Sequence, residues 1–156
     1  MRAHGSTRAL RANLALPGVS PSPVRLSLPA EARNIAVVRR ALEAIAEELA
    51  LPRRQIEDMR LAVTEACTNV VRHAYTDVEA RDASAMRVAL LPETDGMQVI
   101  VEDRGRGLGP SSDPRGPGLG LPLIAALTSQ LEVSHGADDR GSRLTMSFAP
   151  APIEAA

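Results

Sequence analysis

Three polar residues recur at intervals of four near the middle of the chain: Glu65, Asn69 and His73. In a helix this spacing places the side chains in one row, and the row falls at the edge of an apolar face. A half-shielded carboxylate can accept a proton or orient a hydroxyl group, and the neutral oxygen of an amide suits Mg²⁺. Taken alone, the spacing also fits a solvated polar edge, because polar residues on helix faces are the norm.

A second group follows the apolar run Val99–Glu102 and reads Asp103-Arg104-Gly105-Arg106-Gly107. A shielded carboxylate at the end of a strand can accept a hydrogen bond from an exocyclic amine such as that of adenine. Glycines after it let the backbone pass close to a ligand. Taken alone, the same motif also makes an ordinary turn.

Two further glycine motifs stand closer to the C-terminus. Gly118-Leu119-Gly120-Leu121 enters a predicted helix, whose free amides and dipole favour an anion. Its spacing matches neither the P-loop nor the dinucleotide fingerprint, and alone it fits a helix entry loop. Gly141-Ser142 opens the last predicted strand, where the serine offers a hydroxyl group and the glycine permits close approach.

Hydrophobic periodicity predicts the elements that position these motifs. Recurrence at three and four residues predicts helices over 30–50, 54–75 and 119–131. Alternation predicts strands at 24–28, in a hairpin over 84–102, and at 131–135 and 142–149. Residues 103–118 are rich in Gly, Pro, Ser and Asp and are predicted to be a loop.

This order of elements predicts an α+β two-layer sandwich, with a mixed, mostly antiparallel sheet and helices on one face. A doubly wound parallel sheet would need regular βαβ alternation, which is missing. We expect one domain over residues 24–150, a flexible N-terminal tail over 1–23 and a frayed C-terminus over 151–156.

Composition excludes several classes of partner. Tyr75 and Phe148 are the only aromatic residues, so stacking on single-stranded nucleic acid is disfavoured. The net charge of -1 gives no general attraction to polyanions, and no apolar run approaches the length of a membrane span. The single cysteine, Cys67, is expected in the core, which fits a reducing cytoplasm. We therefore expect a cytoplasmic protein that contacts neither nucleic acid nor a membrane.

In this order and context, the four motifs resemble those of the GHKL superfamily of ATPases, which includes histidine kinases, gyrase, Hsp90 and MutL. Glu65–Asn69 resembles the N-box, Asp103–Gly107 the G1 box, Gly118–Leu121 the G2 box and Gly141-Ser142 the G3 position. Within the superfamily, the run Leu61–Tyr75 is similar to the anti-sigma-factor serine/threonine kinases, the RsbW-like proteins. The resemblance covers about residues 24–149.

The resemblance implies a Bergerat ATP-binding fold with ATP and Mg²⁺ as ligands. It implies that Glu65 is the general base, Asn69 the Mg²⁺ ligand and Asp103 the reader of the adenine ring. The other positions that match the nucleotide-binding motifs are Gly105, Gly107, Gly118, Leu119, Gly120, Leu121 and Ser142.

The resemblance also implies protein partners. Such proteins bind a sigma factor, phosphorylate a serine or threonine of an anti-anti-sigma (STAS-type) protein, and commonly form homodimers. It therefore implies a serine/threonine protein kinase that regulates transcription by partner switching. Arg39 lies where the family carries a partner-contacting arginine, and Arg40 beside it is the alternative match.

Two features depart from the family pattern. Pro110–Pro117 is short and proline-rich where the family often has a longer lid, and Ser142 replaces the more usual threonine. The short lid keeps open a second hypothesis, a non-catalytic ATP-binding module that only sequesters a protein partner. A detached histidine-kinase catalytic domain is a third, and it is disfavoured because no dimerisation helix with a phosphoacceptor histidine precedes Val24.

Overall fold

The computed structural model describes the residues in the ranges 20–75, 84–106, 120–136 and 139–150. The predicted frayed end and most of the predicted tail and glycine-rich loop lie outside these ranges. The elements in chain order are β1 (Val24–Pro29), α1 (Ala32–Glu48), α2 (Arg53–Asn69), the π-helical turn η1 (Val70–Ala74), β2 (Ala85–Pro92), β3 (Met97–Asp103), α3 (Gly120–Leu127), β4 (Gln130–His135) and β5 (Ser142–Phe148). None of the helices in the described ranges is both long and apolar enough to cross a membrane.

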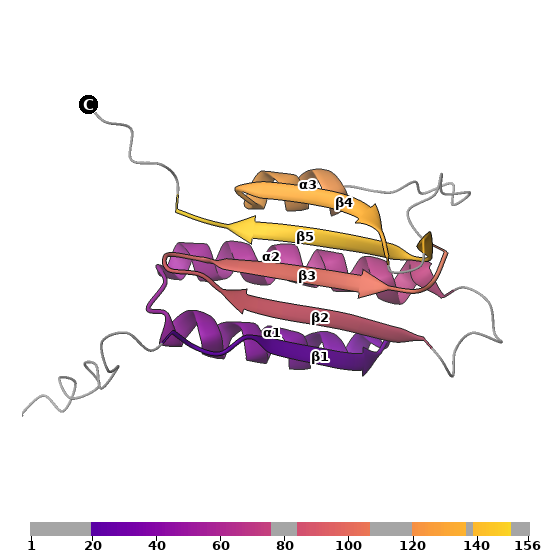
Figure 1. Ribbon diagram of the computed structural model, residues 1–156, viewed down its shortest axis with the longest axis horizontal. Coiled ribbons are helices and arrows are strands. Elements are labelled where there is room, and N and C mark those ends of the chain that lie inside the picture. The colour runs from indigo at the N-terminus through magenta and orange to yellow at the C-terminus, as the bar shows by residue number, and fades with distance from the viewer. Residues whose placement is uncertain (1–19, 76–83, 107–119, 137–138, 151–156) are drawn as a thin grey trace, which may run out of the picture.

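The strands form one five-stranded sheet in the order β1-β2-β3-β5-β4. Each pairing between neighbours in this order is antiparallel. The three α-helices lie on the same side of the sheet, behind the strands in Figure 1. The prediction of an α+β two-layer sandwich with helices on one face is confirmed, and its described strand pairs are all antiparallel.

The core fills the space between the helices and the sheet. Alternate residues of β3 and β5 are buried, as the period of two predicts. From the helices, Val38 and Leu42 of α1 and Met59 and Val63 of α2 are fully buried. Cys67 is buried with them, and burial raises the pKa of its thiol to about 12, so the prediction of a core cysteine is confirmed.

The second predicted helix ends differently from its prediction. The α-helix stops at Asn69, and η1 continues as a π-helical turn to Ala74. A π-helical turn closes its hydrogen bonds over five residues instead of four, so the row that starts at Glu65 does not continue regularly beyond Asn69. His73 is exposed, whereas Glu65 and Asn69 are half-buried.

The third predicted helix is too long at its C-terminal end. It was expected to reach Leu131, but α3 ends at Leu127 and β4 begins at Gln130. The hydroxyl of Thr128 donates back to the Ile124 carbonyl at 3.0 Å, and the Ser129 amide donates to a carbonyl of β5 at 2.8 Å. Such side-chain and strand contacts compete with further helical turns.

Candidate functional site

Two of the predicted site residues lie at one end of the sheet, where β3 ends and β5 begins. Asp103 is the last residue of β3 and Ser142 is the first residue of β5. The next pair along the ladder, Glu102 and Arg143, is in register. This places Asp103 and Ser142 side by side on the face that the helices cover.

The carboxylate of Asp103 is buried and held at both oxygens. The side chain of Ser142 donates to Oδ2 at 2.5 Å, and the amide of Gly105 donates to Oδ1 at 2.8 Å. Asp103 is 3% exposed and Ser142 is 6% exposed. Each carboxylate oxygen can accept a second hydrogen bond, so the group can receive a ligand amine in a fixed orientation.

Two glycines let the backbone approach the end of β3. Gly141 has a φ of +70°, and a Cβ atom there would lie 2.0 Å from the Asp103 carbonyl oxygen. A Cβ atom at Gly136 would lie 3.0 Å from the same oxygen and 2.3 Å from the Arg140 carbonyl oxygen. The sequence motif pointed to Gly141, whereas Gly136 was missed because its neighbours become apparent only in the folded chain.

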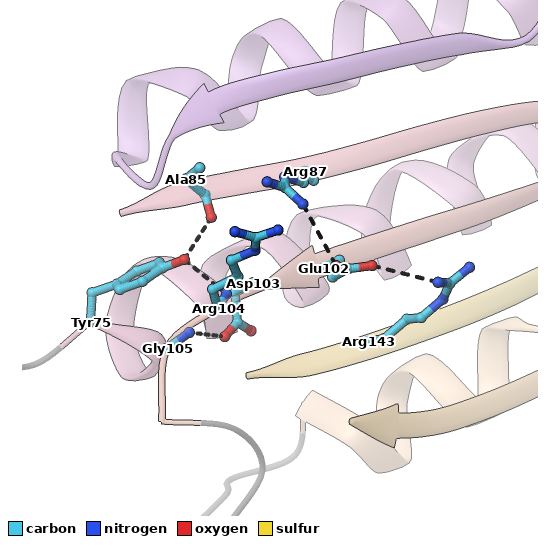
Figure 2. Close-up of polar contacts among 8 residues, drawn as sticks. All are labelled: Tyr75, Ala85, Arg87, Glu102, Asp103, Arg104, Gly105 and Arg143. Carbon is cyan, nitrogen blue, oxygen red and sulfur yellow. Dashed lines mark hydrogen bonds and ion pairs between the residues drawn. The ribbon is translucent and has the colours of Figure 1, made fainter. Parts of the chain in front are cut away.

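The turn after Asp103 rests on the end of η1, which continues the second helix. The Arg106 amide donates to the Ala74 carbonyl at 2.9 Å, and a Cβ atom at Gly105 would lie 1.9 Å from the same carbonyl oxygen. Close backbone contact therefore requires glycine at this position. The hydroxyl group of Tyr75 contacts the same turn (Figure 2), a contact that sequence reasoning did not assign to the site.

The helix motif lies beside the start of α3. Glu65 and Asn69 stand one turn apart on α2 and are half-buried. A Cβ atom at Gly120 would lie 3.2 Å from Asn69 Nδ2 and 3.3 Å from Asn69 Oδ1. The structure thus brings Asn69 against Gly120, and Leu121 packs against the core next to Gly120.

For the remaining predicted site residues the structure shows no contact with these. Gly107, Gly118 and Leu119 lie outside the described residues. Arg39 lies half-buried on α1, a helix that packs against α2, β1 and β2. Among the described residues, no three His, Cys, Asp or Glu side chains are grouped as a metal site.

Glu102 points to the opposite face of the sheet from Asp103. Its carboxylate lies between two arginines of the neighbouring strands (Figure 2). Nη1 of Arg143 is 3.6 Å from Oε2, and Nη1 of Arg87 is 4.0 Å from Oε1. These residues line a hollow of about 260 Å³ on the outer face of the sheet.

Known proteins resemble this chain in sequence. Residues 28–148 match the model of a family described as the histidine kinase-like ATPase domain. The chain is 32% identical over 142 residues to the serine-protein kinase RsbW of Halalkalibacterium halodurans, over 81% of this chain and 83% of that protein. It is 29% identical over 140 residues to the serine-protein kinase RsbW of Bacillus cereus, over 80% of this chain and 82% of that protein.

A solved structure shares the fold. It contains the RsbU and RsbW domains of Rv1364c from Mycobacterium tuberculosis, and it superposes with a TM-score of 0.64 at 24% identity. The match covers 83% of this chain and 32% of that longer chain. At this identity the likeness supports the architecture of the sheet and helices.

Proposed function

The chain belongs to the family of histidine kinase-like ATPase domains and, within it, to the RsbW serine-protein kinases, and from this we propose that it is an anti-sigma factor with ATP-dependent serine/threonine kinase activity. Its substrate is a serine or threonine of an anti-anti-sigma protein of the STAS type. Its second partner is a sigma factor, which it sequesters. Phosphorylation of the first partner decides which of the two is bound.

The observation that carries this proposal is the buried carboxylate of Asp103. It is held at both oxygens by Ser142 and Gly105, and it lies at a strand end whose following turn rests on the second helix. A fixed, buried acceptor suits the exocyclic amine of adenine, because that amine then replaces its water contacts with a hydrogen bond to a charged group. Asp103 is therefore proposed to read the base.

The start of α3 is proposed to receive the phosphates. Backbone amides in the first turn of a helix lack partners within the helix and attract anions, and Gly120 begins α3. Glycine has no side chain, so the glycines of the motifs are proposed to let the backbone come close to the phosphates. The residues assigned to this part of the site are Gly105, Gly107, Gly118, Leu119, Gly120 and Leu121.

Asn69 fits the role of a Mg²⁺ ligand. Its amide lies against Gly120, where a side chain would come within 3.3 Å of Oδ1, so the oxygen sits beside the proposed phosphate site. Mg²⁺ is commonly bound by one or two protein oxygens together with substrate phosphates. When bound, the ion would neutralise charge on the transferred phosphoryl group.

Glu65 is proposed to be the general base. It stands one helical turn before Asn69 and is half-buried, so its carboxylate can receive the proton of the attacking hydroxyl group near the phosphates. Phosphoryl transfer depends mainly on positioning and charge stabilisation, and the packing of α2 against α3 and the sheet provides the positioning. Arg39, on α1, is proposed to contact the protein partner.

The test separates nucleotide binding from phosphoryl transfer. Labelled ATP and Mg²⁺ are incubated with the protein and with anti-anti-sigma proteins encoded near its gene, and phosphoserine or phosphothreonine is measured. Glu65→Gln should keep ATP binding and lower the transfer rate by about 100- to 10,000-fold, the usual contribution of a general base. Glu57→Gln is the matched control, because Glu57 lies on the same helix and pairs with Arg53 at its surface.

Two results would count against the proposal. A folded protein that binds no adenine nucleotide would remove ATP binding and kinase activity together. Nucleotide binding without a phosphoprotein, unchanged by Glu65→Gln, would leave a non-catalytic module that only sequesters a partner.

A further inference from the structure

Three successive backbone amides after β3 each have a defined acceptor. The Arg104 amide donates to the Tyr75 hydroxyl oxygen at 2.9 Å. The Gly105 amide donates to Asp103 Oδ1 at 2.8 Å, and the Arg106 amide donates to the Ala74 carbonyl at 2.9 Å. Two of the three acceptors belong to Ala74, the last residue of η1, and to Tyr75 directly after it, so the end of η1 sets the course of the turn.

Tyr75 joins three segments through one hydroxyl group. It accepts from the Arg104 amide and donates to the Ala85 carbonyl at 2.7 Å (Figure 2). Ala85 begins β2, and the next residue, Met86, pairs with Asp103 across the sheet. The hydroxyl therefore ties the helix end to the start of β2 and to the end of β3.

The chemistry of the phenol supports this role. Burial, the largest cause, raises the pKa of Tyr75 above its ordinary value of 10.0. The group therefore remains protonated around neutral pH and can donate to the Ala85 carbonyl while it accepts from Arg104. A hydroxyl group that makes both bonds restrains the position of its two partners more than one that makes either alone.

We propose that Tyr75 is a positioning residue for the adenine end of the nucleotide site. Asp103 stands on the sheet, whereas Glu65 and Asn69 stand on the helix, and the Tyr75 hydroxyl group fixes the turn where these two parts meet. This inference rests on the proposed function, because it assigns Asp103 to the adenine amine. Without the hydroxyl group, the turn keeps only one of its two anchors on the end of η1, so the distance of the carboxylate from the helix is less closely fixed.

The test compares two nucleotides in Tyr75→Phe, which removes only the oxygen atom. ATP carries the exocyclic amine, and purine riboside triphosphate lacks it. The affinity for ATP should fall about 3- to 10-fold, the size of one hydrogen bond, while the affinity for purine riboside triphosphate stays the same. The preference for ATP over the analogue should therefore shrink by the same factor, which a general loss of stability would not produce.

The matched control is Ser129→Ala. The Ser129 hydroxyl group also makes two bonds of this kind, since it donates to the Ser147 carbonyl at 2.8 Å and accepts from the Ala149 amide at 3.1 Å. These partners lie at the far end of β5 from Ser142. Ser129→Ala should leave the preference for ATP unchanged.

The outcomes separate this inference from the proposed function. If the wild-type protein binds no adenine nucleotide, the proposed function fails and the inference falls with it. If the wild-type protein prefers ATP and Tyr75→Phe keeps the full preference, only the inference is overturned. It is also overturned if both nucleotides weaken equally, or if Ser129→Ala reduces the preference as much.

Hydrogen exchange provides a second measurement on the nucleotide-free protein. The Arg104 amide should be protected in the wild-type chain, because it has a defined acceptor, and should exchange faster in Tyr75→Phe. An Arg104 amide that exchanges freely in the wild-type protein would overturn the inference even if the variant did not fold.

Discussion

Two neighbouring carboxylates on β3 are held in contrasting ways. Asp103 faces the helices, is 3% exposed, and accepts hydrogen bonds at 2.5 and 2.8 Å. Glu102 faces the other side of the sheet, where its own side chain is 13% exposed and its nearest arginine nitrogens are 3.6 and 4.0 Å away on side chains that are 44% exposed. The first carboxylate is fixed in direction by hydrogen bonds, whereas the second is balanced by charge alone.

The neighbouring strand repeats the same division. Ser142 of β5 points inward to Asp103, and Arg143 points outward to Glu102. Because successive side chains alternate between the faces of a sheet, Asp103-Ser142 forms a buried hydrogen-bonded pair on one face, and Glu102-Arg143 forms a partly exposed ion pair on the other. The difference teaches that hydrogen bonds of fixed direction, and not the amount of charge, distinguish the Asp103 carboxylate from that of Glu102.

The largest expected effect follows the removal of the buried carboxylate. Asp103→Ala leaves the Gly105 amide and the Ser142 hydroxyl group without their acceptor, and we expect the free energy of unfolding to fall by about 3 kcal/mol, as buried donors without partners do. Urea denaturation of the nucleotide-free protein measures it. A loss below about 1 kcal/mol, the size of an ordinary surface change, would mean that the hydrogen bonds to Asp103 stabilise the fold no more than the ion pairs of Glu102 do.

Ser142→Ala should have an intermediate effect. It removes the hydrogen bond to Asp103 Oδ2 and leaves the rest of the carboxylate in place, so we expect a loss of about 1 to 2 kcal/mol in the free energy of unfolding. Ser134→Ala, on the exposed strand opposite Arg143, is the control and should change the value by less than about 0.5 kcal/mol. Equal losses for the two serines would contradict the contrast between the faces.

The smallest effect is expected on the outer face. Glu102→Gln removes the charge but keeps the size of the side chain. The two arginine partners are 44% exposed, and their nitrogens lie 3.6 and 4.0 Å away, beyond hydrogen-bond distance, so the free energy of unfolding should change by less than about 1 kcal/mol. The change should become smaller still in 1 M salt, where charges are screened within about 3 Å. A large loss that persists at high salt would show that Glu102 is held as firmly as Asp103.

Much of the fold could be predicted from the sequence, because local patterns carry it. The alternation in β3 and the helical spacing of Val38 and Leu42 each depend on neighbours in the chain. The end of α3 was mispredicted because Leu127 and Leu131 also stand four apart, although Leu131 pairs with β5 as part of a strand. Pairing between distant segments decided this boundary.

The candidate site was predicted only in part, for the same reason. Asp103 and Ser142 could be proposed from their motifs, and the structure places them in contact. The roles of Tyr75 and Gly136 depend on carbonyl and amide groups far away in the chain, and no local pattern encodes those contacts. The nucleotide-binding roles of the motif residues, including Gly107, Gly118 and Leu119 outside the described ranges, stay predictions.

Tyr75 has one more consequence. It is the only tyrosine, and the chain contains no tryptophan. Nearly all of the protein's ultraviolet fluorescence must therefore come from this ring, whose hydroxyl group is hydrogen-bonded to the Ala85 carbonyl and to the Arg104 amide. The molecule thus carries an intrinsic optical reporter at the junction between its sheet and its second helix.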